Sequence, residues 1–393
     1  MFRKKTVRDI SVAGRTVLVR VDFNVPIQDG HVTDDTRIRA TLPTLNYLLE
    51  HGAALVLASH LGRPKGRPDP AFSLRPVVEP LTALLGREVA FATDPAGPDA
   101  QAKAAALRPG QVLLLENTRF DPGETRNDPD FAQRLAGLAH IFVNDAFGTA
   151  HRMHASTVGV ARYLPAVAGF LLAKEVDTIT RLLEAPARPL VTLLGGAKIS
   201  DKIKVLHNLL PRADRLLIGG GMANTFLAAQ GYRMAKSLVE VQARETAIAL
   251  LETYGDKIVL PEDLIVADRL AADARTQRVT VAEGVPDGWM ALDIGPATVE
   301  RFAPHLRTAG SIIWNGPMGV FELPPFAQGT FAVARLVAES PGFSLVGGGD
   351  SVAALHQSGL ADRIDHISTG GGATLKLLAG EPLPAVEVLE DRA

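Results

Sequence analysis

The chain has 393 residues, of which 47% are hydrophobic and 21% are charged. That length predicts two or three domains rather than one core, and the composition is that of a folded protein, not a disordered one. The formal net charge of −2 gives no overall field favouring nucleic acid or a membrane, so a polyanion site must be local. Cysteine is absent, which excludes disulfides, thiol nucleophiles and zinc–thiolate sites and fits a reducing compartment.

No stretch of the sequence has the pattern of a secretory signal or of a membrane-spanning segment. The N-terminal stretch MFRKKTVRDISVAGR is basic but has no apolar core of the kind found in signal peptides. The longest apolar stretch, 164–173, is interrupted by Pro165 and Gly169 and is too short to span a bilayer. We therefore expect a soluble, cytoplasmic protein.

Short apolar runs rich in β-branched residues alternate with longer amphipathic segments along the chain. Such runs are typical of strands buried on both faces of a parallel sheet, and the alternation predicts an α/β fold with right-handed crossovers. The expected strands are 16–21, 53–59, 112–115, 141–143, 190–194, 216–219, 311–314 and 343–346. The expected helices include 40–51, 74–85, 130–139, 200–210, 239–254 and 326–339.

Nearly every expected strand runs into a polar or glycine-rich cluster at its carboxyl end. The clusters read DFNVP, SHLGRP, NTRF, NDAFGTAHR, GGAKISDK, GGGMANTF, NGPMGVFE and GGGDS. Ligands of open parallel sheets bind outside the carboxyl ends of the strands. We therefore expect these clusters to form binding sites.

The clusters change character near the middle of the chain. Those before residue 160 contain Arg37, His60, Arg63, Arg119, His151 and Arg152, whereas those after residue 190 contain Lys198, Lys202, Gly219 to Gly221, Asn315, Glu322 and Asp350. Between them, 169–184 reads as one helix, followed by the helix-breaking segment 185–189. This predicts two doubly wound domains with a boundary there; a single large sheet is the alternative, which the length disfavours.

The arginines of the first half predict a site for a small, multiply anionic substrate. Guanidinium groups on separate loops can form forks for phosphate or carboxylate, and without a ligand they would repel one another. The alternative is that each arginine pairs with a nearby acid such as Asp22, Glu116 or Asp145. Asp22 and Asn24 could accept from hydroxyls or serve as turn residues, and His60 could bind substrate, act as an acid or base, or be structural.

The stretch GGGDS predicts a metal-bridged polyphosphate site in the second half. A strand that breaks into glycines and opens a helix, with Ser351 or Asp350 as the N-cap, presents backbone N–H groups to an anion. Because Asp350 would repel phosphates, a cation is expected between them, and oxygen ligands favour Mg²⁺. A glycine-rich turn that the aspartate only caps is the alternative.

Other residues of the second half suit the same nucleotide. Lys198 and Lys202 lie four residues apart across a helix start and could hold phosphates, or they could be solvated surface lysines. Gly219 to Gly221 could let a flat base lie on the backbone or could permit close packing of strand on helix. Glu322 could accept from ribose hydroxyls or be a surface charge, and the glycines at 370–372 open another helix start.

Several well-known motifs are absent from the sequence. It has no G-x-x-x-x-G-K-[ST] phosphate loop, and no G-x-G-x-x-G follows an expected strand, which disfavours a dinucleotide-dependent dehydrogenase.

Eight motifs together resemble the phosphoglycerate kinase family. RVDFNVP, SHLGRP, ENTRF, NDAFGTAHR, GGAKISDK, WNGPMGVFE, GGGDS and STGGGAT occur in the order of that family, and the likeness extends from residue 17 to 389. The resemblance implies two doubly wound, Rossmann-like domains joined by a hinge. The phosphoglycerate-binding domain would comprise 1–168 with 380–393 packed back on it, the nucleotide-binding domain 169–379, and the hinge helix about 169–185.

The resemblance also assigns roles to individual residues. Phosphoglycerate binding would fall to Asp22, Phe23, Asn24, Arg37, His60, Leu61, Gly62, Arg63, Arg119 and Arg152. Catalysis would involve Arg37, Lys198 and Gly371. Nucleotide binding would fall to Lys202, Gly219, Gly220, Gly295, Asn315, Glu322, Gly348, Gly349, Asp350 and Ser351, with Asp350 as the Mg²⁺ ligand.

The implied reaction is the reversible, Mg²⁺-dependent phosphoryl transfer between 1,3-bisphosphoglycerate and ADP that gives 3-phosphoglycerate and ATP in glycolysis. The resemblance further implies a monomer with no nucleic-acid or membrane partner. A non-catalytic protein that binds nucleotides or phosphoanions is the alternative. The chain departs from the family at Asn224, where an aromatic residue is common, and at Met153, where a small residue is usual; neither is expected to touch a ligand.

Overall fold

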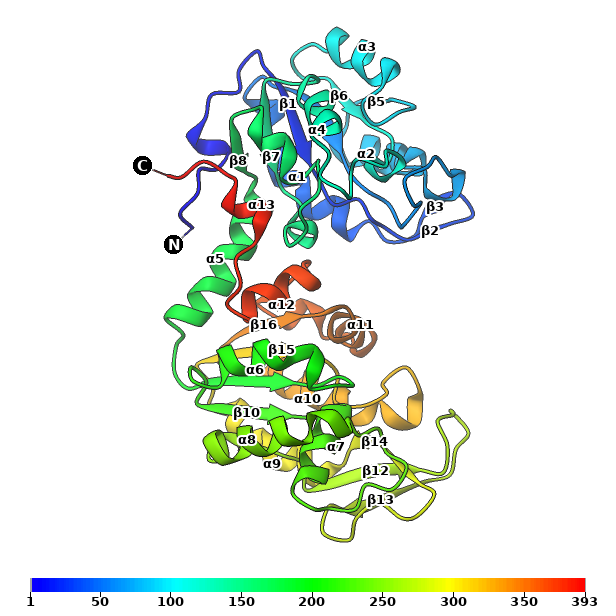
Figure 1. Cartoon of the computed structure of the whole chain (residues 1–393), viewed down its shortest axis with the longest axis vertical. Helices are drawn as coiled ribbons and strands as arrows, with labels where there is room; N and C mark the ends of the chain where they lie inside the picture. The colour runs from blue at the N-terminus through cyan, green and yellow to red at the C-terminus, as the bar shows by residue number, and fades with distance from the viewer. Residues whose placement is uncertain (1, 393) are drawn as a thin grey trace. The chain divides into compact units, whose positions relative to one another are not determined.

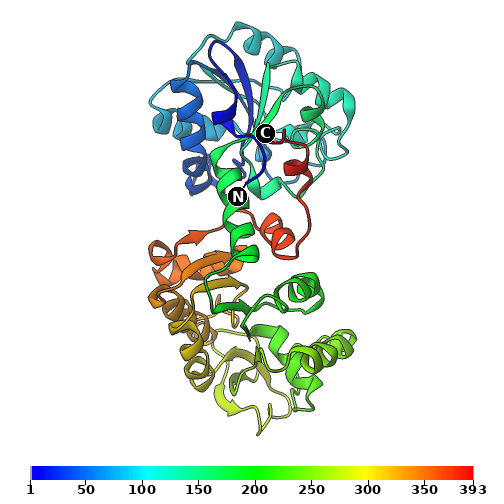
Figure 2. The ribbon, with the colours of Figure 1, turned by 90° about the vertical axis from the view of Figure 1, so that its left-hand side faces the viewer.

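A computed structural model describes residues 2–392 of the chain, which form two compact units (Figure 1, Figure 2). Residues up to Thr178 together with those from Pro382 onward make up the first unit, and Ile179–Glu381 the second. The boundary falls inside α5 (Phe170–Glu184) rather than at its beginning. The sequence analysis includes residue 393 in the segment that packs back on the first domain, and that residue lies outside the described part.

The first unit is built on a six-stranded parallel sheet. Its order is β5 (Val89–Phe91), β6 (Val112–Leu114), β4 (Ala54–Ala58), β1 (Thr16–Arg20), β7 (Ile141–Asn144), β8 (Ala166–Ala168). Val17 of β1 pairs with Leu55 on one side and Ile141 on the other. The chain therefore leaves the centre of the sheet in both directions, and the crevice between β1 and β7 is the switch point at which such sheets bind ligands.

Helices cover this sheet because its strands are apolar on both faces. They are α1 (Thr36–Glu50), α2 (Val78–Leu85), α3 (Pro98–Ala106), α4 (Pro129–Ala136) and the first part of α5, with a short hairpin of β2 (Ile27–Gln28) and β3 (His31–Val32) beside them. Val19 and Leu57 of the sheet form one core with Leu45 and Leu48 of α1 and Leu81 of α2.

The first and last described residues of the chain lie in the first unit, close to β8 and α13 (Pro384–Glu387) (Figure 1). The backbone N–H of Lys5 donates to the carbonyl of Glu390 at 2.8 Å, and the N–H of Glu390 donates to the carbonyl of Ala166 in β8 at 2.9 Å. The returning segment therefore covers an edge strand that would otherwise expose its hydrogen-bonding groups.

The second unit has a parallel sheet of the same size. Its order is β11 (Ile258–Val259), β10 (Arg215–Ile218), β9 (Leu190–Leu194), β15 (Ser311–Asn315), β16 (Phe343–Gly347), β17 (His366–Ile367). The switch point lies between β9 and β15. Its helices are α6 (Ile203–Leu209), α7 (Gly220–Ala229), α8 (Arg244–Tyr254), α9 (Pro296–Arg307), α10 (Gln328–Glu339), α11 (Gly349–Ser358) and α12 (Gly372–Leu378).

Helices lie on both faces of this second sheet, as the predicted doubly wound fold requires. Figure 2 shows the gold and orange helices α9 to α11 on one side and the green helices α6 to α8 on the other. Phe302 of α9, Val333 of α10 and Leu355 of α11 share one core with the fully buried Trp314 of β15. The predicted fold class is confirmed.

The second unit also contains a three-stranded antiparallel sheet that the sequence analysis missed. Its order is β13 (Thr276–Thr280), β12 (Asp263–Ala267), β14 (Met290–Ile294). β13 is largely exposed and has no apolar run to mark it. Within the described residues, no helix combines the length and apolarity that crossing a bilayer requires.

All eight strands expected from the sequence are present, with ends that agree to within one residue. The helices begin less regularly than expected. The segments 74–85, 200–210 and 239–254 each start with a turn of 3₁₀-helix, so that α2, α6 and α8 begin at Val78, Ile203 and Arg244.

Candidate active site

The basic residues of the first half are brought together at the carboxyl ends of four adjacent strands. Asp22 follows β1, His60 and Arg63 follow β4, Arg119 follows β6, and Arg152 follows β7. In the sheet these strands stand in the order β6, β4, β1, β7. The predicted cluster is therefore a consequence of strand order, and α1 adds Arg37 from its first turn.

Backbone and side-chain hydrogen bonds hold these loops to one another. Arg37 donates to the carboxylate of Asp22 at 2.9 Å, and the N–H of Gly62 donates to Oδ1 of Asn24 at 3.0 Å. Arg119 donates to the carbonyl of Gly62 at 2.7 Å. The loops after β1, β4 and β6 are thus tied together before any ligand is present.

The alternative in which each arginine has its own acid holds only for Arg37. Arg63, Arg119 and Arg152 make no ion pair with a carboxylate anywhere in residues 2–392. Two acids suggested as partners are used elsewhere: Glu116 accepts from Ser73 at 2.6 Å, and Asp145 accepts from the N–H groups that begin α5. Three guanidinium groups are therefore left for an anion.

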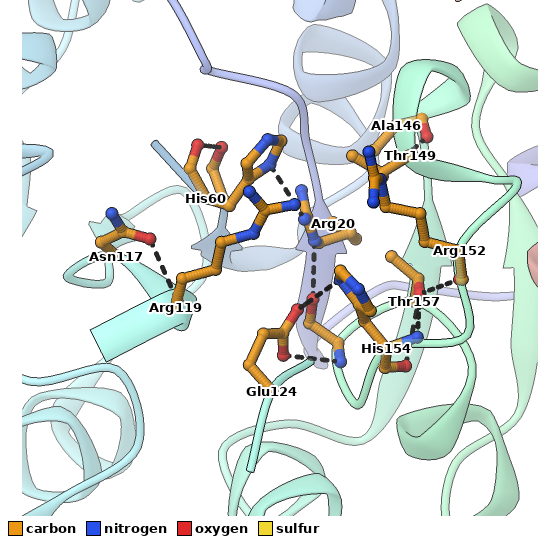
Figure 3. A network of polar contacts seen from close by, with 12 residues as sticks. Arg20, His60, Asn117, Arg119, Glu124, Ala146, Thr149, Arg152, His154 and Thr157 are labelled. Carbon is orange, nitrogen blue, oxygen red and sulfur yellow. Dashed lines mark hydrogen bonds and ion pairs between the residues drawn. The ribbon is translucent and has the colours of Figure 1, made fainter. Parts of the chain in front are cut away.

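A buried polar network lies beneath this cluster (Figure 3). Arg20, the last residue of β1, donates through Nε to Oγ of Ser156 at 2.7 Å, and Ser156 donates to Oε1 of Glu124 at 2.5 Å. The side chain of Arg20 also reaches Nδ1 of His60, with Nη2 at 3.3 Å. Because a guanidinium nitrogen can only donate, Nδ1 of His60 is the acceptor and its proton is on Nε2.

The concentration of positive charge shifts the pKa values of the groups inside it. Burial and the neighbouring Arg20 and Arg152 lower the pKa of Arg119 to about 10. Burial, together with Arg20 and Arg119, holds the pKa of His60 well below its ordinary value, and burial with nearby Arg119 lowers that of His154 to about 3. Both histidines are therefore neutral at pH 7, so His60 offers an N–H donor and does not act as a protonated acid.

A cavity of about 610 Å³ opens beside these groups, lined by Arg63, Arg119, Arg152 and His154 among others. That volume suits a small molecule. The sequence analysis did not identify Arg20, Glu124 or His154. The one available signal was the arginine at the end of the apolar run TVLVR, since a charge in a strand buried on both faces needs buried partners.

The glycine-rich loops of the second unit also meet at the carboxyl edge of their sheet. The hydroxyl oxygen of Ser351 accepts from the N–H of Gly316 at 2.6 Å, and Nδ2 of Asn315 donates to the carbonyl of Gly347 at 2.9 Å. Lys202 donates to the carbonyls of Gly195 at 2.6 Å and Asn315 at 3.0 Å. The loops after β9, β15 and β16 are therefore joined as one surface.

The start of α11 has the geometry of an anion site. Gly348 is its N-cap, with φ of 96°, and a Cβ there would lie 2.9 Å from Nδ2 of Asn315, so glycine is required. The expectation that Ser351 or Asp350 is the N-cap is wrong, because both lie inside the first turn. Gly349 and Asp350 are exposed, and the first N–H groups of the helix point toward any ligand held there.

The two predicted lysines differ in their surroundings. Lys198 is exposed, whereas Lys202 is largely enclosed, and burial lowers its pKa to about 8 despite the opposing effect of Asp350. Lys202 precedes α6 at the end of a 3₁₀ turn, so its ammonium group turns back under the loop carbonyls. One of its three N–H donors remains for a phosphate oxygen.

A cavity of about 510 Å³ extends from Asp350 along α7 and β14, and Gly220, Gly221 and Glu322 line it. Gly219 and Gly295 are not in its wall. A Cβ on Gly219 would lie 2.4 Å from the sulfur of Met318, and one on Gly295 would lie 2.2 Å from the carboxylate of Asp263. Glycine at these two positions therefore allows the backbone to pack closely against those side chains. Asn224, expected to lie away from any ligand, is in the wall of this cavity.

A family model described as phosphoglycerate kinase matches residues 7–381. The chain belongs to the phosphoglycerate kinase family. This confirms the resemblance drawn from the eight motifs, and with it the class of a kinase that transfers a phosphoryl group to or from a carboxyl group. The non-catalytic alternative is not favoured.

Full-length relatives agree with the family assignment. Phosphoglycerate kinase of Chloroflexus aurantiacus is 58% identical over 99% of this chain and 100% of its own, and that of Moorella thermoacetica is 57% identical with the same coverage. Among solved structures, phosphoglycerate kinase from Coxiella burnetii matches with a TM-score of 0.89 and 43% identity over 98% of each chain.

The residues around Asp350 fit a magnesium ion that is shared with a ligand. Within the described residues, no group of three or more His, Cys, Asp or Glu side chains could enclose a metal ion. Mg²⁺ is commonly held by one or two carboxylates, with phosphate oxygens and water completing an octahedron. An exposed carboxylate in the first turn of a helix that also receives phosphates meets that requirement.

Proposed function

We propose that the chain transfers the acyl phosphate of 1,3-bisphosphoglycerate to ADP, giving 3-phosphoglycerate and ATP, and that it also catalyses the reverse reaction in glycolysis. The observation that supports this most directly is the set of guanidinium groups without acid partners at the carboxyl edge of the first sheet. A multiply anionic substrate would replace the missing counter-charges. The family assignment then specifies which anion.

In this proposal the first unit binds the phosphoglycerate. Arg63, Arg119 and Arg152 neutralise its charge, while Asp22 and Asn24 accept from its hydroxyl groups. His60 donates through Nε2, since Arg20 occupies Nδ1. The backbone of Phe23, Leu61 and Gly62 shapes the loops that present these groups.

The second unit binds the nucleotide. Gly348 and Gly349 present N–H groups to its phosphates, and Lys202 and the backbone N–H of Ser351 donate to the same oxygens, while the buried hydroxyl of Ser351 holds the loop by accepting from Gly316. Glu322 accepts from the ribose hydroxyls, while Asn315, Gly219, Gly220 and Gly295 support the loops around them. Mg²⁺, held by Asp350, would neutralise phosphate charge when bound.

The chemical step needs no general base. A β-phosphate oxygen of ADP attacks the acyl phosphorus, the bond from phosphorus to the carboxyl oxygen breaks, and the carboxylate departs; neither oxygen loses a proton. Catalysis then consists of alignment and stabilisation of the charge on the phosphoryl oxygens. We assign that stabilisation to Arg37, Lys198 and the backbone N–H groups at Gly371, where α12 begins.

Direct transfer requires the two ligands to meet. We therefore propose domains close to the predicted limits, with α5 as the hinge, and closure that excludes water from the acyl phosphate. We also propose that the protein acts as a cytoplasmic monomer, without a nucleic-acid or membrane partner.

Replacement of Arg37 tests the assignment of the phosphoryl site. Arg37→Ala is expected to lower kcat by about 10²-fold or more, because a charge-stabilising group aimed at the transition state is lost. Arg39→Ala is the matched control, since Arg39 lies on the same helix and pairs with Asp35 at 2.8 Å. A kcat of Arg37→Ala close to that of Arg39→Ala would remove Arg37 from the transition state.

A further inference from the structure

Asn224 is a polar side chain in the wall of an apolar cavity. It lies on α7, is only 3% exposed, and faces the cavity of about 510 Å³ that also contains Glu322 and Asp350. Its carboxamide makes no hydrogen bond to any residue in the range 2–392. The cavity leaves the polar atoms of this carboxamide open to solvent, so a ligand that fills the cavity must supply their hydrogen-bond partners or leave them unpaired, which is unfavourable.

The surroundings of Asn224 suit a flat, largely apolar ligand. Leu264, Met290 and Met318 line the cavity, and Leu238 and Leu270 form part of its wall while remaining 51% and 59% exposed. Large apolar side chains left open to water in this way gain from being covered. An aromatic ring between them would do so.

The other polar groups of this cavity are occupied or lie toward its phosphate end. The two oxygens of Asp293 accept from the N–H groups of Ile294 at 2.9 Å and Gly329 at 2.8 Å. Glu322 and Asp350 are assigned above to the ribose and to Mg²⁺, and Lys236 is exposed. Asn224 is therefore the neutral hydrogen-bonding side chain that remains for the ring of the ligand.

We propose that Asn224 is a specificity-determining residue that reads the base, by pairing with the 6-amino group of adenine and the ring nitrogen next to it. This inference rests on the proposed nucleotide site. A carboxamide presents an acceptor and a donor side by side, which matches an exocyclic amino group and an adjacent ring nitrogen. A purine without the 6-amino group leaves Oδ1 of Asn224 unpaired in a buried site.

The test compares ADP with purine riboside 5′-diphosphate, which differs from ADP only in lacking the 6-amino group. The dissociation constants of both are measured by calorimetry for the wild type and for Asn224→Leu, a substitution of similar size. In the wild type ADP is expected to bind about tenfold more tightly than the analogue. In Asn224→Leu that ratio is expected to fall to about one.

Two controls separate base reading from damage to the fold. Asn208→Leu replaces an asparagine of the same unit whose amide donates to the carbonyl of Leu378, and it is expected to leave the ratio unchanged. Tripolyphosphate, which has no base, is expected to bind the wild type and Asn224→Leu equally. A loss of tripolyphosphate binding in Asn224→Leu would show that the substitution had disturbed the whole site. In that case the proposal is judged only by the ratio of the two dissociation constants in the wild type.

Equal affinity of the wild type for ADP and the analogue would overturn the proposal, as would an unchanged ratio in Asn224→Leu that still binds tripolyphosphate normally. The nucleotide site itself is judged separately. If the wild type binds neither nucleotide, the proposed function fails; if it binds and phosphorylates ADP but ignores the 6-amino group, only the role of Asn224 fails.

Discussion

The substitution Glu124→Gln tests the buried network beneath the basic cluster. Glu124 is completely buried, and its carboxylate faces Ser156, which in turn accepts from the buried guanidinium of Arg20. Burial raises the pKa of Glu124, and the charge of Arg20 opposes that rise. Both oxygens of Glu124 accept from Ser156, one from its hydroxyl and one from its backbone N–H. Glutamine keeps the shape and one acceptor oxygen, so the substitution removes the negative charge and one of these two hydrogen bonds.

The expected loss of stability follows from what the substitution leaves behind. Arg20 would remain buried with only the weaker counter-charge of Asp22. Breaking a buried pair at one partner typically lowers the free energy of unfolding by about 3–5 kcal/mol. At an m-value of about 3 kcal/mol/M in urea, that moves the unfolding midpoint down by roughly 1 M or more. Binding of 3-phosphoglycerate is expected to be retained, because the site gains net positive charge.

Urea unfolding followed by far-UV circular dichroism measures the effect. Both tryptophans, Trp289 and Trp314, belong to the second unit, so their fluorescence reports on that unit separately. Glu116→Gln is the matched control, because Glu116 is also buried but accepts only from Ser73 and from backbone N–H groups. If Glu124→Gln lost no more stability than Glu116→Gln, the carboxylate would not be balancing Arg20, and the reasoning would be refuted.

Two further predictions concern pH. Because burial lowers the pKa of Lys202 to about 8, the free protein loses this cation as pH rises, and the dissociation constant of ADP is expected to increase by up to tenfold between pH 8 and 9. Lys202→Met should bind ADP more weakly, and its dissociation constant should not rise between pH 8 and 9. Calorimetry at several pH values checks this, and an identical pH profile in both proteins would contradict it. Burial raises the pKa of Asp145 to about 7, so its folded state favours the protonated form, and stability present below about pH 4 is lost as pH rises through 7. Asp145→Asn keeps an acceptor for the N–H groups of α5, and its free energy of unfolding should lack up to about 4 kcal/mol of that decline. The difference in free energy of unfolding between variant and wild type must therefore grow from pH 4 to pH 7, which unfolding curves at several pH values check.

The inner strands could be predicted because burial on both faces makes them continuous apolar runs. All four outermost strands of the two parallel sheets, β5, β8, β11 and β17, went unrecognised. They have only two or three residues each, too few to show a period. β13 was missed for a related reason, since an exposed antiparallel strand such as Thr276–Thr280 has the composition of a loop.

The clustering of site residues was predictable for the same structural reason. A polar cluster that follows a buried strand must lie at the carboxyl edge of the sheet, and this placed Arg63, Arg119 and Asp350 correctly at strand ends or helix starts. What could not be predicted were contacts between distant parts of the chain. The bond from Arg20 to Ser156 spans 136 residues, and the place of Asn224 in the cavity wall depends on how α7 packs beside β14.

Phosphoryl transfer itself tests the central claim most directly. Wild-type protein is mixed with Mg²⁺-ATP and 3-phosphoglycerate, and formation of the acyl phosphate is followed with a coupled assay, with and without chelator. We predict turnover that requires both substrates, stops when Mg²⁺ is removed, and falls about 10²-fold or more in Arg37→Ala. Folded protein that binds both ligands by calorimetry yet transfers no phosphoryl group would contradict this prediction and would identify the chain as a binding protein.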